Sequence, residues 1–400
     1  MSSGYRTIPS GGITSAKGFL AGAVHAGIRS EDKLDLAILY SQALCAGAGV
    51  FTTSQIKSAP VVTSQRHLAS GRGQAIVANS GCANACAGEQ GLADALEMAG
   101  LAAAKLRIPL EDVLVASTGV IGVPLPMERV RFGIKEIELS REGGHDFARA
   151  IMTTDTRPKE IAVQVDTGGF IVGGAAKGAG MIHPDLATML CFITTDALVD
   201  ASFLRSSLLK AVEISLNMIS IDGDTSPSDC VFLLANGLAG SDAISFNNGG
   251  AFQEALNTVC VHLAKSIARD GEGATKLIEV AVEGARQQPE ARLAARTIAS
   301  SALVKAAMHG NDPNWGRIVA ALGRSGAQVV GKRLDVYLNN ICVMKQGCPM
   351  SFSKEELRTA LAKANDIPIR VCLNLGNGRA TAWGCDLSEE YVTINSEYTT

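Results

Sequence analysis

Residues 177–190 are the segment whose residue types and order suggest a covalent reaction. Lys177 and two glycines lead to a small residue, Ala187, and then to the hydroxyl residue Thr188. If the backbone is bent there, the Thr188 hydroxyl can attack the Ala187 carbonyl, and water can open the resulting ester. Thr188 would then begin a new chain. Its α-amine, with a pKa of about 7.7–8.0, could act as the base for its own hydroxyl. On these residue types alone, an ordinary loop entering a strand is the favoured interpretation.

Other segments match chemical motifs only in part. Residues 326–332 fit seven positions of a phosphate-binding loop, but Arg333 replaces the hydroxyl that should hold Mg²⁺, so a hairpin between two strands is favoured. The acidic segment 222–229 could form a cation loop, although a turn capped by its own side chains is favoured. The six histidines lack zinc-binding spacing. No Gly-x-Ser-x-Gly elbow supports a Ser-His-Asp triad, which could still assemble from distant positions.

Composition argues against several classes of partner. The 400 residues carry 36 basic and 39 acidic side chains, a net charge of −3, which leaves no excess positive charge for nucleic acid or an anionic membrane. The longest charge-free stretch, residues 36–56, is interrupted by polar residues and glycine and does not predict a membrane span. Ten cysteines without a Cys-x-x-Cys pair predict free, buried thiols in a reducing compartment. With no visible signal peptide, these features predict a cytoplasmic enzyme or small-molecule binder.

Hydrophobic patterns predict the strands and helices that would position the reactive segment. Short apolar runs predict strands at residues 75–78, 113–116, 161–165, 189–193, 231–234 and 329–338. Helical periodicity covers residues 92–106, 201–219, 251–269 and 291–308. Asp200 is the expected N-cap of the second helix, and Ser353 with Glu356 forms a capping box before a further helix. This mixture predicts an α/β fold, with a sub-boundary near residues 241–250, where asparagine and glycine cluster.

Residues 177–190 resemble the signature Lys-Gly-x-Gly-Met-Ile-x-Pro-x-x-Ala-Thr-Met-Leu of the ornithine acetyltransferase (glutamate N-acetyltransferase) family of arginine biosynthesis. Further blocks resemble the family in the expected order, at residues 79–85, 117–122, 152–159, 222–225, 270–276, 310–317 and 394–400. Each block alone is a weak signal. Together they span about 320 residues, so the resemblance extends across nearly the whole chain.

The resemblance implies a fold and a reaction. The fold would be a layered sandwich with two mixed β-sheets flanked by helices (α/β/β/α), plus a smaller C-terminal α/β portion. The precursor would cleave itself between Ala187 and Thr188 into an α fragment, residues 1–187, and a β fragment, residues 188–400. Thr188 would then carry an acetyl ester between two half-reactions. N-acetylornithine donates the acetyl group and ornithine leaves; glutamate accepts it and leaves as N-acetylglutamate.

The resemblance also implies roles for single residues. Thr118 and Gly119 match the oxyanion-hole pair, which would donate hydrogen bonds to the tetrahedral intermediate. Substrate binding carries over to six positions, namely Thr154, Lys177, Thr188, Glu272, Asn395 and Thr400. Lys177 can hold a carboxylate and Glu272 can meet an ammonium, the charged groups that ornithine and glutamate present. Neither a metal nor an organic cofactor is implied.

Two segments depart from the family pattern. Asp185 and Leu186 stand where the family commonly has Asn and Met in His-Pro-Asn-Met-Ala-Thr, and the charge of Asp185 three residues before the nucleophile could slow maturation or shift its pH dependence. Cys82 replaces the Asn expected in Asn-Ser-Gly-Asn-Ala. Neither change touches the nucleophile, the oxyanion pair or the binding residues, so the expected chemistry is retained.

The oligomeric state, the set of acetyl donors and the class of protein stay open in the sequence. The resemblance implies an assembly of two α and two β fragments, with acetyl-CoA as an optional further donor that would make the enzyme bifunctional. A self-processed aminopeptidase of the related fold, in which water takes the acyl group, is the nearest alternative. A non-catalytic amino-acid-binding protein is the other. The Ala187–Thr188 pair inside a Gly-rich loop favours the transferase, because a pure binder has no use for a scissile pair.

Overall fold

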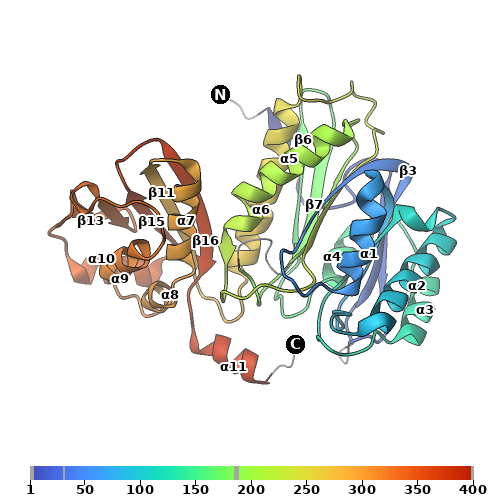
Figure 1. The fold of residues 1–400 in the computed structure, drawn as a ribbon, viewed down its shortest axis with the longest axis horizontal. Helices are drawn as coiled ribbons and strands as arrows, with labels where there is room; N and C mark the ends of the chain where they lie inside the picture. The colour runs from blue at the N-terminus through green and yellow to red at the C-terminus, as the bar shows by residue number, and fades with distance from the viewer. Residues whose placement is uncertain (1–3, 30–31, 184–188, 398–400) are drawn as a thin grey trace.

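The computed structural model describes residues 4–29, 32–183 and 189–397, which form two mixed β-sheets with helices packed on them (Figure 1). The strands of the larger sheet follow the order β1-β6-β7-β8-β10-β3-β4-β5, with β2 paired to β3. Their bounds are β1 Tyr5–Thr7, β2 Phe19–Val24, β3 Leu36–Phe51, β4 Arg72–Asn79, β5 Val113–Ser117, β6 Lys159–Val165, β7 Ile171–Lys177, β8 Leu190–Thr195 and β10 Cys230–Ala235. Strand β4 runs parallel to β5 and β8 parallel to β10, and the other pairs are antiparallel.

The larger sheet folds back on itself at β3. The N-terminal part of this 16-residue strand pairs with β2 and β4, whereas residues 46–51 pair with β10. The register against β4 shifts between Tyr40 and Cys45, as in a β-bulge, and such an irregularity bends a strand. The two halves of the sheet therefore face each other as two layers.

A hydrophobic core fills the space between these layers. Alternate residues of the strands point into it, such as Leu190 and Phe192 of β8 and Ile76 of β4. The Phe192 ring lies 5.4 Å from that of Phe147 and 5.8 Å from that of Phe232, between ring centroids. The first contact joins α4 (Gly144–Ala150) to β8, and the second joins paired residues of β8 and β10 within one layer.

Helices cover the two outer faces of the folded sheet. Helices α2 (Gly88–Leu106) and α3 (Met127–Glu136) enclose one outer core, and α5 (Ala201–Ile214) and α6 (Gly250–Arg269) enclose the other. Helix α1 (Ala59–His67) packs on β5. Helix α4 (Gly144–Ala150) instead contributes Phe147 to the core between the layers and contacts β2 and β3. The expected α/β/β/α fold class is confirmed, and its two β layers are halves of one continuous sheet.

The smaller C-terminal α/β portion is also confirmed. Its sheet has the order β14-β13-β12-β15-β11-β16-β9. The strands are β9 Ile219–Ser220, β11 Leu277–Ala285, β12 Asp335–Leu338, β13 Ile341–Lys345, β14 Cys348–Pro349, β15 Asp366–Cys372 and β16 Gly378–Cys385. The helices are α7 Gln288–Ala299, α8 Ala302–His309, α9 Trp315–Gly323, α10 Lys354–Lys363 and α11 Glu389–Glu397. Residues 241–249 connect β10 to α6, and both of these elements belong to the sandwich.

Local sequence signals located β4, β5, β6, β8, β10, α2, α6 and α10 and the start of α5, gave no indication of many other elements, and failed in four places. The helix expected over 201–219 ends at Ile214 and is followed by a 3₁₀ turn over residues 216–218. Asp200 caps α5 by accepting hydrogen bonds from the Ser202 and Phe203 amides, and the Ser353 hydroxyl caps α10. The single helix expected over 291–308 is wrong, because the chain turns at residues 300–301 between α7 and α8. The strand expected from residue 329 starts only at Asp335, after a 3₁₀ turn over residues 331–333. The hairpin expected at 326–332 is also wrong, since this segment follows α9 rather than a strand.

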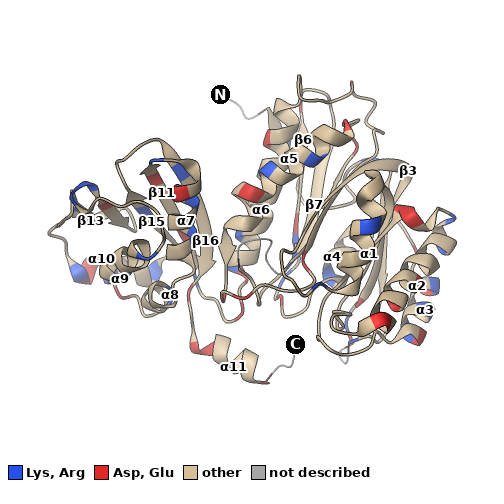
Figure 2. Ribbon diagram, viewed as in Figure 1, with Lys and Arg blue, Asp and Glu red and all other residues tan. Residues whose placement is uncertain are grey.

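Charges and cysteines are distributed much as the composition suggests. Figure 2 shows basic and acidic residues interspersed along the helices that cover the sandwich, as expected for a net charge of −3. Among the described residues, no helix is both long enough and apolar enough to cross a membrane. All ten cysteines are free, but Cys86 and Cys348 are exposed, contrary to the expectation that all are buried.

Candidate active site

One cavity collects every expected site residue that the structure describes. Its lining includes Thr118, Gly119, Thr154, Lys177, Glu272 and Asn395. They come from the turn after β5, the loop between α4 and β6, the end of β7, the loop between α6 and β11, and helix α11. Ala187, Thr188, Thr400 and the departure Asp185 lie outside the described residues.

The cavity lies where the layers of the sandwich meet at their strand ends. Lys177 is the last residue of β7, and its partner in the antiparallel pair is Leu190, the first residue of β8. Met189, which follows Thr188 in the sequence, is buried and accepts a hydrogen bond from the Cys230 amide. The chain segment that carries the expected nucleophile therefore returns to the sheet beside Lys177.

The turn after β5 holds Thr118 and Gly119 in place through Asn79. The Ser117 hydroxyl donates to the Asn79 side-chain oxygen at 2.6 Å, and the Thr118 amide donates to the Asn79 carbonyl at 3.0 Å. Gly119 has φ +128°, and a Cβ there would lie 2.4 Å from the Gly81 carbonyl carbon, so only glycine fits. Among residues 4–29, 32–183 and 189–397, no acceptor is hydrogen-bonded to the Gly119 amide. Within the described residues, the turn thus leaves this N–H group available to a ligand.

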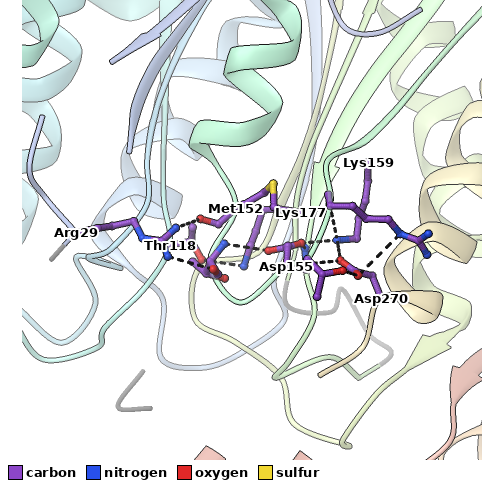
Figure 3. Close-up of polar contacts among 11 residues, drawn as sticks. Arg29, Thr118, Met152, Asp155, Lys159, Lys177 and Asp270 are labelled. Atoms are coloured by element: carbon purple, nitrogen blue, oxygen red, sulfur yellow. Dashed lines mark hydrogen bonds and ion pairs between the residues drawn. The ribbon is translucent and has the colours of Figure 1, made fainter. Parts of the chain in front are cut away.

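Lys177 reaches the same turn from the opposite layer. Its side chain is buried, and its ammonium lies 3.4 Å from the Thr118 hydroxyl oxygen (Figure 3). Because the ammonium is the donor in this contact, the Thr118 hydroxyl hydrogen can point elsewhere and donate to a ligand. Burial lowers the pKa of Lys177, and the nearby Asp155 carboxylate opposes that shift. The cavity therefore holds a cation whose charge depends on its neighbours.

Glu272 supplies the opposite charge. Its carboxylate accepts a hydrogen bond from the Asn395 side chain at 2.7 Å, which ties helix α11 to the cavity. The Glu272 amide donates to the Ala179 carbonyl at 2.8 Å, so the carboxylate lies against the Gly-rich loop. A Cβ at Gly180 would lie 2.5 Å from the Glu272 carboxylate, so a side chain at this position would crowd Glu272. An ammonium, a carboxylate and several hydroxyls in one cavity suit a zwitterionic amino acid.

Six further residues that the sequence did not predict as site residues line the cavity. These are Ala83, Ile121, Thr153, Met181, Ser226 and Ser228. Ser226 and Ser228 belong to the acidic segment 222–229, which the sequence predicts as a turn. Both residues reach the cavity because this turn leads directly into β10, next to β8 in the sheet. Only the order of strands in the sheet brings these residues to the site.

The same turn supports the Gly-rich loop. The Asp222 carboxylate accepts hydrogen bonds from the amides of Met181 at 2.5 Å and Ile182 at 2.8 Å, and from its own turn at Asp224 at 3.2 Å. The self-capped turn is therefore confirmed, and it also fixes the segment after Lys177. Among the described residues, no group of three or more His, Cys, Asp or Glu side chains is placed to hold a metal ion.

Cys82, the departure within the block at residues 79–85, lies away from the cavity. Its side chain is buried in the outer core under α2 and α3, and its thiol donates to the Val123 carbonyl at 3.4 Å. Its backbone carbonyl accepts a hydrogen bond from the Asn79 side chain at 2.9 Å. The substitution therefore alters packing behind the Thr118 turn and leaves the lining unchanged.

A larger cavity lies in the C-terminal portion, between the start of α9 and α10. It is lined by Asp312, Asn314, Trp315, Phe352 and Arg358, among others. None of the residues expected to act in the reaction contributes to it. The smaller cavity in the sandwich is therefore the candidate site, because it gathers the reactive side chains.

Comparisons with known proteins agree with the family resemblance seen in the sequence. A family model described as "ArgJ family" matches residues 20–400. A protein from Dehalococcoides mccartyi named "Arginine biosynthesis bifunctional protein ArgJ" is 53% identical over the full length of both chains. One of the same name from Symbiobacterium thermophilum is 52% identical, covering 98% of this chain and 99% of its own. The crystal structure of a protein so named from Bacillus halodurans is 46% identical, covers 53% of this chain and all of its own, and has a TM-score of 0.52.

The Thr118–Gly119 turn allows a test of its packing. Gly119→Ala should reduce the free energy of unfolding by about 1–3 kcal/mol more than Gly122→Ala, because only the first Cβ would collide with backbone. Gly122 also has a positive φ, +82°, but nothing lies within 4 Å of its added Cβ, so it controls for backbone strain. Urea denaturation of both variants measures the difference. Equal losses would contradict the close approach to Gly81.

Proposed function

Because this chain belongs to the ArgJ family, we propose that it transfers the acetyl group of N-acetylornithine to glutamate, giving ornithine and N-acetylglutamate in arginine biosynthesis. The family membership makes it an acetyltransferase. The observation that carries the proposed reaction is the meeting of the Thr118–Gly119 turn, Lys177 and Glu272 in one cavity beside the start of β8. Thr188, two residues before Leu190 in the sequence, would supply the nucleophile.

Self-cleavage would precede transfer. The Thr188 hydroxyl attacks the Ala187 carbonyl, the peptide nitrogen leaves as the α-amine of Thr188, and water hydrolyses the resulting ester. The products are residues 1–187, with a new carboxylate, and residues 188–400, with a free amine and hydroxyl on Thr188. The solved chain from Bacillus halodurans supports this step, since its full length corresponds to 53% of this chain, the share that residues 188–400 make up.

Transfer would then proceed in two half-reactions. The Thr188 oxygen attacks the acetyl carbonyl of N-acetylornithine while the α-amine takes up the hydroxyl proton. The Thr118 hydroxyl and the Gly119 amide donate to the developing oxyanion. Collapse of the intermediate breaks the C–N bond, ornithine leaves with the proton, and an acetyl ester remains on Thr188. The amine of glutamate then attacks the ester carbonyl, the C–O bond to Thr188 breaks, and the Thr188 oxygen regains a proton as N-acetylglutamate leaves.

The charges of the cavity would select the substrates. Lys177 would hold a substrate carboxylate, and Glu272 the side-chain ammonium of the ornithine moiety. Thr154, Asn395 and Thr400 would add neutral hydrogen bonds. We further propose a cytoplasmic assembly of two α and two β fragments, with acetyl-CoA as an additional acetyl donor, as the word "bifunctional" in the relatives' names suggests.

The intact mass of the purified protein under denaturing conditions tests maturation. We expect two species that end at Ala187 and begin at Thr188, and a single species of 400 residues for Thr188→Ala. Thr188→Ser, which keeps a hydroxyl, is the matched control and should still be cleaved. A wild-type protein that remains one chain would contradict the proposed self-cleavage.

An acetyl-exchange assay tests the reaction. The processed enzyme should form N-acetylglutamate from N-acetylornithine and glutamate, in equal amount to the ornithine released. Release of free acetate at the same rate without glutamate would instead favour the aminopeptidase, in which water takes the acyl group. Binding of ornithine without any acetyl exchange would favour the non-catalytic protein. Parallel assays with acetyl-CoA as donor decide whether the enzyme is bifunctional.

Thr118→Val should lower kcat by about 10²–10³ with a small change in KM, because the hydroxyl would act mainly on the transition-state oxyanion. Thr118→Ser retains the hydroxyl and should keep kcat within about tenfold of the wild-type value. Steady-state kinetics on the processed fraction of each variant measures the effect. A loss expressed only in KM would argue against a role in stabilising the oxyanion.

A further inference from the structure

A buried ion cluster lies directly behind the candidate site. The Lys159 side chain is almost fully buried, and its ammonium lies 2.6 Å from an oxygen of Asp155 and 2.6 Å from an oxygen of Asp270 (Figure 3). Both carboxylates are also buried. None of these three residues lines the cavity, and the reaction proposed above assigns no role to them.

The cluster connects the chain segments that carry the site residues. The Asp155 carboxylate accepts hydrogen bonds from the Gly178 amide at 2.7 Å and the Thr153 amide at 3.0 Å. Gly178 follows Lys177 in the sequence, and Thr153 precedes Thr154. A single carboxylate thus fixes the backbone beside two of the expected substrate-binding residues.

Asp270 anchors the third segment. Its carboxylate accepts hydrogen bonds from the amide of Thr156, at 3.0 Å, and from the hydroxyl of the same residue. Asp270 precedes Glu272 by two residues, so the loop that carries Glu272 is attached to the loop that carries Thr154. Lys159 bridges the two carboxylates and keeps the three segments in one arrangement.

Arg29 holds the far side of the Thr154 loop. Its guanidinium donates to the carbonyl of Met152 at 2.8 Å and to that of Thr153 at 3.2 Å. Arg29 itself is held by the buried Asp35, whose carboxylate accepts from the Arg29 amide at 3.0 Å. Since both sides of this loop are tied down, Asp155 has little freedom to move relative to the cavity.

Asp155 also faces the Lys177 ammonium. Asp155, Asp229 and Glu272 raise the pKa of Lys177, whereas burial and Lys159 lower it. Burial raises the pKa of Asp229 itself, which favours the neutral form of that carboxyl. Asp155 is the strongest of the opposing groups. The Lys159 and Lys177 ammoniums in turn hold the pKa of Asp155 below its usual range despite its burial, so this carboxylate stays ionised.

We propose that Asp155 is a positioning residue of the transfer site, which fixes the backbone beside Lys177 and beside Thr154 and acts as the counter-charge of Lys177 without touching the substrate. The inference rests on the proposed function, in which Lys177 binds the substrate carboxylate. Without the Asp155 charge, Lys177 would lose its proton at a lower pH, and carboxylate binding would be lost there too. Asp155 would thus set the alkaline limit of substrate affinity.

Asp155→Asn tests this proposal, because it keeps the shape of the side chain and removes its charge. We expect the pH at which KM for N-acetylornithine rises to fall by about one unit or more, a tenfold change in proton concentration. The titration of Lys177 should move equally, as seen by NMR of the protein with isotope-labelled lysine. Its resonance is assigned by its absence in Lys177→Arg. The NMR readout does not depend on acetyl transfer.

Two further variants separate the charge effect from a general loss of structure. Asp270→Asn removes a buried carboxylate that pairs with the same Lys159 but is not among the strongest influences on Lys177. The Lys177 titration should therefore shift much less in Asp270→Asn than in Asp155→Asn. Lys159→Gln removes a positive charge, so the Lys177 titration should move to higher pH. This opposite sign keeps the proposal testable if Asp155→Asn fails to fold.

The possible outcomes distinguish failure of the proposed role of Asp155 from failure of the proposed function. Equal shifts in Asp155→Asn and Asp270→Asn, an unchanged Lys177 titration in Asp155→Asn, or a downward shift in Lys159→Gln would overturn the role of Asp155. A wild-type enzyme that exchanges no acetyl group would overturn the proposed function instead. The lysine titrations would still decide whether Asp155 is the counter-charge of Lys177.

Discussion

The buried ammonium of Lys159 imposes the constraint on which the site depends. A charge in a protein interior is stable only where opposite charges and hydrogen bonds replace water. Asp155 and Asp270 meet this requirement from two different loops, each 2.6 Å from the ammonium. Each carboxylate then uses its remaining capacity on backbone amides, that of Gly178 for the first and that of Thr156 for the second. One electrostatic requirement therefore fixes three loops in a single arrangement.

The bend in β3 brings the ends of β5 and β7 together at the site. Along the sheet, β7 and β5 are separated by five strand steps, which would place them about 24 Å apart in a flat sheet at about 4.8 Å per step. In the folded sheet the Lys177 ammonium lies 3.4 Å from the Thr118 hydroxyl. The oxyanion turn and the carboxylate-binding lysine of the proposed transfer can share a cavity only because the sheet folds back on itself.

Local sequence signals sufficed where an element is decided by its own residues. Short apolar runs located β4, β5, β6, β8 and β10, and side-chain caps located the starts of α5 and α10. Local signals failed where contacts with residues far along the chain determine the local structure. The apolar periodicity runs on through residues 291–308, but the chain turns between α7 and α8 at two serines, which are a weak stop signal. Likewise, residues 331–333 turn where the Gly347 backbone packs against them.

The sequence by itself determined the residue types that can do the chemistry, the family resemblance that relates them, and the helices and strands with strong local patterns, such as β4, β5, α2 and α6. It did so because propensity, capping and apolar periodicity act over a few residues. Tertiary structure alone decided that Thr118, Lys177 and Glu272 meet, that Ser226 and Ser228 join them, and that Asp155 lies behind Lys177. These facts depend on the strand order and on the pairing of buried charges distant in the chain, which no local pattern encodes.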